Sequence, residues 1–202
     1  MSPYSFVYLA SQSPRRRQLL EQLGVPYELL LPDASEDAEA LEVVLPSESP
    51  KAYVQRVTLL KLTAALLRMK RRGLVSAPVL CSDTTVAVGG AILGKPNDPM
   101  HAQQMLSTLS GKTHRVLTAV AVGSVRKQRQ TLSISNVRFA PMTDQQIKHY
   151  VGSGEPMGKA GAYAIQGRAA AHIEHISGSY SGIMGLPMFE TAQILRDFGF
   201  KV

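Results

Sequence analysis

The sequence predicts an α/β fold: a mixed sheet with flanking helices, arranged as two lobes around a central cleft. In the first half of the chain, short apolar runs alternate with segments of helical periodicity. In the second half, residues 116–125 and 131–140 are apolar runs separated by a basic turn, which indicates an antiparallel pair of strands. The 202 residues contain no linker and no internal repeat, so we expect a single domain over residues 1–202.

The first unit is a strand, a tight turn and a helix. Residues 6–10 are apolar, Ser13 is a good helix cap, and Pro14 suits the first helical position. Three arginines at 15–17 then occupy the first turn, where the helix dipole disfavours each cation by about 0.3–1 kcal/mol. Free backbone N–H groups and guanidinium groups together are suited to phosphate. This stretch is therefore interpreted either as a phosphate site or as a solvated basic helix start.

A second strand is expected over residues 27–31, and residues 32–50 form an acidic, irregular segment. Its carboxylates are Asp33, Glu36, Asp37, Glu39, Glu42 and Glu48. Two interpretations stay open for this segment. It is a solvated loop, or it brings one or two carboxylates to a metal ion or a water molecule.

A long helix follows over residues 49–72, with Ser49 as its cap and Pro50 in its first turn. Lys61 lies directly after two leucines, and its simplest interpretation is a lysine that extends to solvent. The basic residues at 68–72 suit the end of a helix and are expected to be solvated. The expected apolar stripe consists of Tyr53, Val57, Leu60, Ala64 and Leu67.

The best central strand candidate spans residues 77–88, and Asp83 interrupts its apolar run. A carboxylate inside a core strand is costly unless it is paired or used, so Asp83 is a candidate functional residue. The Gly89–Gly90 pair predicts a hairpin turn that returns a short strand and places Lys95 close to the Asp83 strand.

The remaining elements follow from caps and periodicity. Asp98 and Thr143 are expected to cap helices over 98–109 and 144–151, and Pro187 to begin a last helix. Residues 152–167 are rich in glycine and alanine, which favours a backbone that closely approaches another group. A strand is expected over 169–176 and a loop over 178–185.

The net charge and composition indicate which kinds of binding partner the protein has. Lysine plus arginine minus aspartate plus glutamate gives 22 − 15 = +7, which favours an anionic partner such as a nucleotide, a nucleic acid or a membrane surface. Nucleic acid is disfavoured, because no basic stripe is interleaved with aromatic residues and tryptophan is absent. The lone Cys81 excludes an internal disulfide and fits a reducing compartment. We find no signal peptide and no run long enough to span a membrane, so we expect a cytoplasmic protein.

The candidate residues share one chemistry. Arginines clamp phosphate oxygens, lysines add charge, and carboxylates bind Mg²⁺ or Mn²⁺ or accept a proton from water. This set indicates metal-assisted hydrolysis of a phosphoanhydride. A Ser/His/Asp hydrolase is disfavoured, because no serine lies in a G-x-S-x-G turn. Residues 110–114 also lack the glycine spacing of a P-loop.

Seven ordered blocks resemble the Maf family of nucleoside triphosphate pyrophosphatases over nearly the whole chain. The blocks are SQSPRRR at 11–17, SDT at 82–84, GKP at 94–96, LSGKTH at 109–114, GEP at 154–156, KAGAY at 159–163 and GLP at 185–187. The resemblance implies cleavage of a nucleoside triphosphate between its α- and β-phosphates, a divalent metal (Mg²⁺ or Mn²⁺), an inosine triphosphatase-like fold and a homodimer.

The resemblance also implies roles for individual residues. Asp83 matches the catalytic aspartate that accepts the proton, and with Glu36 of the acidic segment it is expected to bind the metal. Because residues 32–50 are longer and more acidic than is usual in the family, Asp33 and Asp37 are alternatives to Glu36. The positions that contact phosphate are Ser11, Arg16, Lys61 and Lys95.

The resemblance also implies which nucleotide base the protein prefers, through three further positions. Arg15, Thr84 and Gln166 match the subgroup that acts on dTTP and UTP. The 7-methyl-GTP subgroup has an aromatic residue in the arginine turn and a glutamate at the glutamine position, and neither is present here. Two alternatives remain: the same chemistry on another nucleotide such as 7-methyl-GTP, and a non-catalytic regulator of cell division.

Overall fold

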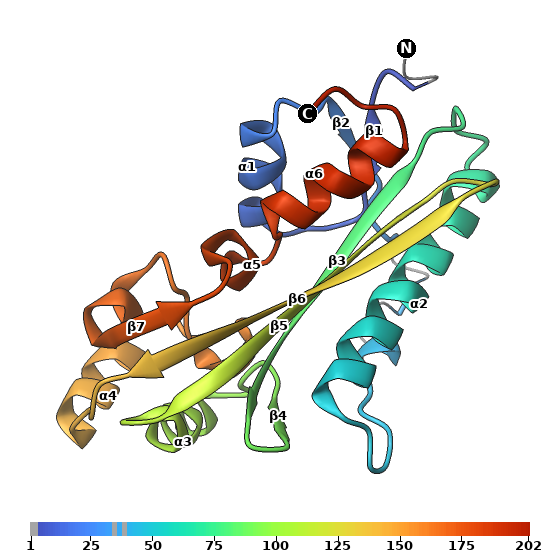
Figure 1. Ribbon diagram of the computed structural model, residues 1–202. Coiled ribbons are helices and arrows are strands. Elements are labelled where there is room, and N and C mark those ends of the chain that lie inside the picture. The colour runs from blue at the N-terminus through green and yellow to red at the C-terminus, as the bar shows by residue number, and fades with distance from the viewer. Residues whose placement is uncertain (1–3, 34–35, 38–39) are drawn as a thin grey trace.

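The computed structural model describes residues 4–33, 36–37 and 40–202, and it has a seven-stranded mixed sheet with flanking helices (Figure 1). The strands are β1 (Val7–Leu9), β2 (Tyr27–Leu29), β3 (Val79–Val88), β4 (Ala91–Leu93), β5 (Thr113–Gly123), β6 (Gln128–Phe139) and β7 (Ile173–Ser177). The α-helices are α1 (Pro14–Gln22), α2 (Pro50–Arg71), α3 (Pro99–Leu109), α4 (Asp144–Gly152), α5 (Tyr180–Met184) and α6 (Met188–Asp197). Short 3₁₀ helices are η1 (Ala40–Glu42), η2 (Ala160–Ala162) and η3 (Arg168–His172). The predicted α/β class with a mixed sheet is confirmed.

The sheet has a break along one edge of its central strand. The strand order is β2-β1-β3-β5-β6-β7, and β1 pairs in parallel with β3 only at Val79 and Leu80. The hairpin partner β4 joins the same strand from Val86 onward. Within the described ranges, no strand pairs with residues 81–85 on the edge opposite β5. The stretch that contains Asp83 is therefore open to a ligand on one side.

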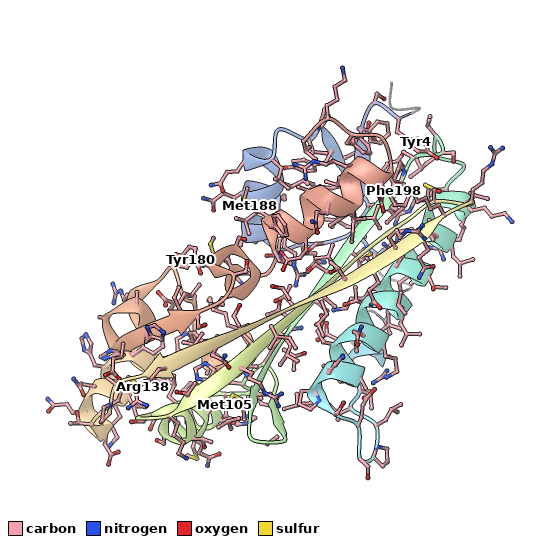
Figure 2. The ribbon with its side chains drawn as sticks, viewed as in Figure 1. Tyr4, Met105, Arg138, Tyr180, Met188 and Phe198 are labelled. Carbon is pink, nitrogen blue, oxygen red and sulfur yellow. The ribbon has the colours of Figure 1, made fainter. Side chains whose placement is uncertain are left out.

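The two faces of the sheet are covered unequally. Among the described α-helices, α2 alone covers one face, and α1, α3, α4, α5 and α6 lie on the other (Figure 1). The larger core lies on the second face and extends from Met105 of α3 to Phe198 after α6, at opposite ends of the sheet (Figure 2). Within the described residues, none of the helices has the length and apolar character needed to cross a membrane.

The predicted helix starts are confirmed. Side-chain oxygens of Ser13, Ser49, Asp98 and Thr143 each accept a backbone N–H from the first turn of α1, α2, α3 and α4. Such a side chain satisfies an N–H that has no partner within the helix. Capping residues are local signals, so the sequence alone places these four helix starts correctly.

The predicted apolar stripe of α2 is partly wrong. Leu60 and Leu67 are 39% and 63% exposed, whereas Leu62, Ala65 and Met69 face the sheet. Both sets have helical spacing, so periodicity alone does not decide which one packs against the strands. Two later predictions also change. Residues 168–172 form η3 before β7 begins, and the expected loop over 178–185 contains α5, capped by Ser179.

A buried histidine, His114, lies in the larger core. Its Nε2 lies 2.7 Å from the Tyr163 hydroxyl, and its ring stacks on Phe139 with centroids 5.5 Å apart. Burial lowers the pKa of His114 to about 4. The neutral ring is therefore the form that the folded protein favours at neutral pH.

We predict that His114 makes folding sensitive to mild acid. The unfolded chain binds a proton at this ring near pH 6.5 and the folded chain only near pH 4, so stability falls as the pH falls between these values. The full loss is about 3 kcal/mol. The free energy of unfolding of wild type and His114→Phe, measured by urea denaturation from pH 7 to 4, should fall less steeply in the variant. Equal pH dependence in the two proteins would contradict the assignment.

Candidate active site

A cavity of about 1,090 Å³ lies at the break in the β3 edge. Its walls come from the β1–α1 turn, the acidic segment, one side of α2, the open part of β3, the turn after β4, residues 157–165 and the end of α5. Eight of the nine predicted site residues line it: Ser11, Arg15, Arg16, Glu36, Lys61, Asp83, Thr84 and Lys95. The structure thus brings together most of the set that was predicted from sequence.

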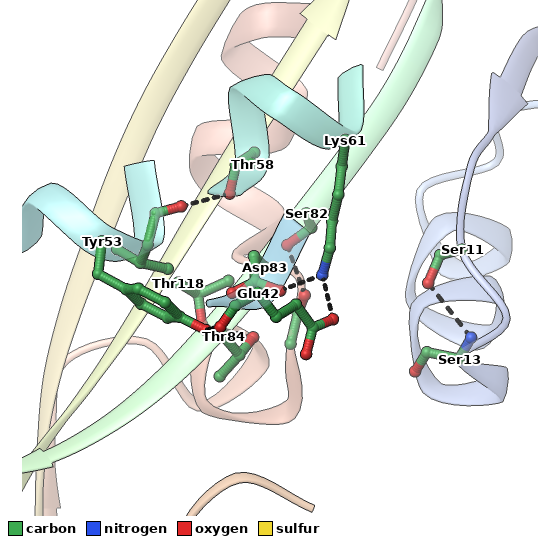
Figure 3. Close-up of polar contacts among 12 residues, drawn as sticks. Ser11, Ser13, Glu42, Tyr53, Thr58, Lys61, Ser82, Asp83, Thr84 and Thr118 are labelled. Atoms are coloured by element: carbon green, nitrogen blue, oxygen red, sulfur yellow. Dashed lines mark hydrogen bonds and ion pairs between the residues drawn. The ribbon is translucent and has the colours of Figure 1, made fainter. Parts of the chain in front are cut away.

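The centre of the cavity is an ion-pair cluster around Lys61. Lys61 Nζ lies 2.5 Å from Asp83 Oδ1 and 2.7 Å from Glu42 Oε1, so this lysine reaches from α2 to two carboxylates (Figure 3). Lys95 Nζ lies 2.9 Å from the other oxygen of Glu42. The interpretation of Lys61 as a lysine that extends to solvent is therefore wrong. Two cations and two carboxylates face one another in a partly desolvated site, where charges interact more strongly than in water.

The sequence does not single out Glu42 from the other carboxylates of its segment, and α2 holds it in this position. The Tyr53 hydroxyl donates to the Glu42 carbonyl at 2.9 Å. Arg56 donates to the Val43 carbonyl at 2.8 Å and pairs with Glu48 at 2.6 Å. The chain that follows η1 is thus tied to the first turns of α2.

Charge and burial shift the pKa values of this cluster. Burial raises the pKa of Glu42, but Lys61 and Lys95 outweigh burial and hold it below its usual range. Burial, with the negative charges of Asp83 and Glu42, raises the pKa of Tyr53 to about 12. Tyr53 therefore stays protonated at neutral pH and keeps its hydrogen bond to the backbone of Glu42.

The arginines at the start of α1 are bound by carbonyl groups at the end of α5. Arg16 Nε donates to the Gly185 carbonyl at 2.9 Å, and its terminal nitrogens donate to Ser11 Oγ at 3.2 Å and Thr84 Oγ1 at 3.4 Å. Arg15 Nε donates to the Met184 carbonyl at 3.3 Å. Carbonyls at a helix end lack partners within the helix, so these contacts offset the unfavourable placement of arginines at a helix N-terminus. They also fix both guanidinium groups beside the cavity.

Glu36 occupies a different environment from Glu42. Arg68 binds its carboxylate with two nitrogens, at 2.6 and 2.9 Å from the nearest oxygens, and Arg71 binds it at 2.8 Å. None of its hydrogen bonds or ion pairs with described residues reaches Lys61, Lys95 or Asp83. Glu36 lines the cavity, and its assignment to a metal stays a prediction.

The basic end of α2 differs from the sequence-based expectation. Arg68 is 6% exposed and also donates to the Leu30 carbonyl at 2.8 Å, so the prediction that this end is solvated is wrong for Arg68. Arg71 and Arg72 pair with Asp33 at 2.9 and 3.1 Å. Asp37, the other alternative to Glu36, accepts the Ala40 N–H at 3.0 Å, and Glu39 lies outside the described residues. Sequence patterns show both charged segments but not their pairing.

The glycine-rich segment approaches the Lys95 turn closely, as predicted. Gly161 N–H donates to the Gly94 carbonyl at 3.0 Å, and Gly161 has φ of 69°. A Cβ atom at this position would lie 2.8 Å from Cγ1 of Val86. Glycine is therefore required both by the backbone conformation and by the contact. Gln166, in contrast, is exposed and does not line the cavity, although Ile165 does.

The fold and the site together define a class of protein. An α/β sheet with a cleft that gathers lysines, arginines and carboxylates is suited to a polyphosphate. A family model described as Maf-like protein matches residues 6–198. The chain therefore belongs to the Maf family.

Relatives of known name are similar over the whole chain. The chain is 70% identical over 197 residues to a dTTP/UTP pyrophosphatase of Albidiferax ferrireducens, with 98% of each chain covered. It is 66% identical over 202 residues to a protein of that name from a Polaromonas species, with 100% of each covered. Among solved structures, a Ham1 protein of Staphylococcus aureus matches with a TM-score of 0.41 and 11% identity over 66% of this chain and 71% of the other.

We predict that Arg68 contributes more to stability than its neighbour Arg72. Replacing Arg68 by Met leaves the carboxylate of Glu36 partly buried with a weakened set of partners and should lower the free energy of unfolding by about 3 kcal/mol. Arg72→Met is the matched control, because the partner of Arg72 is the half-exposed Asp33, and its loss should stay below about 1 kcal/mol. Chemical denaturation measures both. Similar losses in the two variants would show that the buried contact has no special weight.

Proposed function

We propose that the protein is a nucleoside triphosphate pyrophosphatase that hydrolyses dTTP and UTP to the monophosphate and pyrophosphate. The observation that carries this proposal is the contact of Lys61 with both Asp83 and Glu42 inside a cavity that also presents Arg16 and Lys95. The relatives named dTTP/UTP pyrophosphatase support the same substrates for this chain.

The cations bind the triphosphate. Ser11, Arg16, Lys61 and Lys95 supply hydroxyl, guanidinium and ammonium donors around the cavity, and phosphate oxygens are acceptors only. In the open site Glu42 is bonded to both lysines, so the triphosphate competes with this carboxylate for them. The same lysines neutralise the negative charge on the departing pyrophosphate. Such charge neutralisation accounts for much of the rate acceleration in phosphoryl transfer.

Asp83 accepts the proton of the attacking water. The water oxygen bonds to the α-phosphorus, its proton passes to the Asp83 carboxylate, and the bond from the α-phosphorus to the bridging oxygen breaks. The bridging oxygen leaves with the pyrophosphate. The position of Asp83 on the open part of β3, at the wall of the cavity, supports this role.

The donors present fit a divalent metal. Asp83 and Glu42 both contact Lys61, and carboxylate oxygens suit Mg²⁺ and Mn²⁺. The described ranges contain no group of three or more histidine, cysteine, aspartate or glutamate residues arranged for a metal, and Mg²⁺ commonly takes one or two carboxylates with phosphate oxygens and water. When bound, such an ion supplies positive charge to the phosphate oxygens. We infer that Asp83 and Glu42 hold it, with Glu36 as the alternative to Glu42.

Arg15, Thr84 and Gln166 select the base in this proposal. Arg15 and Thr84 line the cavity, and Gln166 lies next to Ile165, which lines it too. The same proposal includes a homodimer that acts in the cytoplasm and binds neither nucleic acid nor membrane. The reduced, buried Cys81 is consistent with that compartment.

A panel assay tests the function directly. Pyrophosphate release from dTTP, UTP, CTP, ATP, GTP and 7-methyl-GTP is measured with Mg²⁺ or Mn²⁺ for wild type and Asp83→Asn. We expect wild type to prefer dTTP and UTP, and Asp83→Asn to lower kcat by about 10²–10⁴-fold with a smaller change in KM. No turnover on any nucleotide would support the non-catalytic alternative, and preference for 7-methyl-GTP would contradict the substrate assignment.

A second experiment separates Glu42 from Glu36. Mn²⁺ binding is followed by electron paramagnetic resonance in the presence of UMP for wild type, Glu42→Gln and Glu36→Gln. We expect Glu42→Gln to weaken Mn²⁺ binding by at least about tenfold, because it removes a charged oxygen ligand. Glu36→Gln should change it little, since Arg68 and Arg71 occupy that carboxylate. The reverse pattern would assign the metal to Glu36.

A further inference from the structure

A chain of two hydroxyl groups and a carbonyl lies at the cavity wall, and its hydrogen bonds all point the same way. Thr84 on β3 and Thr118 on β5 are directly paired in the sheet, and their hydroxyl oxygens lie 3.0 Å apart. Thr118 Oγ1 also lies 2.7 Å from the carbonyl oxygen of Gly182 in α5. Thr118 is 1% exposed, whereas Thr84 lines the cavity. Figure 3 shows the two threonines side by side.

The direction in which each hydroxyl proton points follows from the number of donors and acceptors around it. A carbonyl oxygen only accepts, so the single proton of Thr118 points to Gly182. Thr118 then has only lone pairs for Thr84, and the single proton of Thr84 must point to Thr118. Arg16 donates to Thr84 Oγ1 at 3.4 Å, which is the contact expected for an oxygen acting as an acceptor. Thr84 therefore presents only lone pairs toward the cavity.

This direction limits what Thr84 can bind. A phosphate oxygen has no proton at neutral pH, so it would meet the lone pairs of Thr84 without a hydrogen bond. A suitable partner must donate a proton. Uracil and thymine have an N–H donor at N3, whereas the N3 atom of cytosine is an acceptor. A hydroxyl that only accepts thus forms a hydrogen bond with uracil or thymine, whereas its lone pairs repel those of N3 in cytosine.

We propose that Thr118 is a positioning residue for base selection: it holds the Thr84 hydroxyl as an acceptor, so that Thr84 receives the N3–H of uracil or thymine and disfavours cytosine. This inference rests on the proposed function, because it concerns the base of the same nucleotide substrates. It assigns a role to a buried threonine that does not touch the substrate.

The test is the selectivity for UTP over CTP, taken as the ratio of their kcat/KM values. In Thr118→Val the Thr84 proton is released and can turn toward N3 of cytosine. We expect the ratio to fall about tenfold, the factor that one neutral hydrogen bond provides. Thr118→Ser keeps the hydroxyl and should retain the wild-type ratio. In the double variant Thr84→Val/Thr118→Val, the ratio should equal that of Thr84→Val alone, because Thr118 acts only through Thr84.

Thr191→Val is the matched control for a buried threonine. Thr191 lies in α6 and is fully buried, and its hydroxyl has no hydrogen-bond partner among the described residues, so its replacement should leave the ratio unchanged. If Thr118→Val does not fold, Thr84→Val alone tests the acceptor role and should also lower the ratio.

The two possible failures are distinguishable. An unchanged ratio in Thr118→Val, or an equal loss on UTP and CTP, would overturn the inference while pyrophosphate release from UTP by wild type upholds the proposed function. An equal loss would also be the result if Thr84 accepted from a ribose hydroxyl. Absence of release from every nucleotide by wild type would overturn the proposed function itself, and the inference with it.

Discussion

The contact of Lys61 with Asp83 is the interaction on which the site depends. Asp83 lies within the central strand, where a carboxylate is costly unless another group compensates its charge. Lys61 supplies that compensation from α2, which is the one α-helix on its face of the sheet in the described part of the chain, and it also pairs with Glu42. In the proposed function, the same cation also binds a phosphate group of the substrate. Lys61 therefore has two roles in this account, which are to stabilise the buried carboxylate and to bind the substrate.

The open edge of β3 explains why the cavity lies where it does. Strands β1 and β4 both pair with β3 but leave residues 81–85 free on that side in the described part of the chain. The β1–α1 turn brings arginines to this opening, and the end of α5 holds them in place through its carbonyl groups. The acidic segment closes the opposite side through Glu42. Each wall of the site comes from a different part of the chain.

Local signals were readable from sequence, whereas pairings between distant segments were not. The caps Ser13 and Ser49 and the interrupted strand at Asp83 are visible because each depends on a few neighbouring residues. Glu42 was one of six acidic residues in an irregular segment, and only the fold brings it to the lysines. The assignment of the exposed Leu67 to the buried stripe is wrong because two faces of α2 have similar apolar spacing, and only the fold shows which face meets the sheet. Eight of the nine predicted site residues line the cavity, and all of these except Glu36 and Lys61 lie in short contiguous motifs of the sequence.

In the proposed reaction, water attacks the α-phosphorus beside Asp83, and isotope labelling tests this step most directly. Hydrolysis of UTP in H₂¹⁸O, with the products analysed by mass spectrometry, shows which phosphorus receives the water oxygen. Attack at the α-phosphorus places ¹⁸O in UMP and leaves the pyrophosphate unlabelled at early times. Label in pyrophosphate and none in UMP would mean attack at the β-phosphorus and would contradict the role given to Asp83.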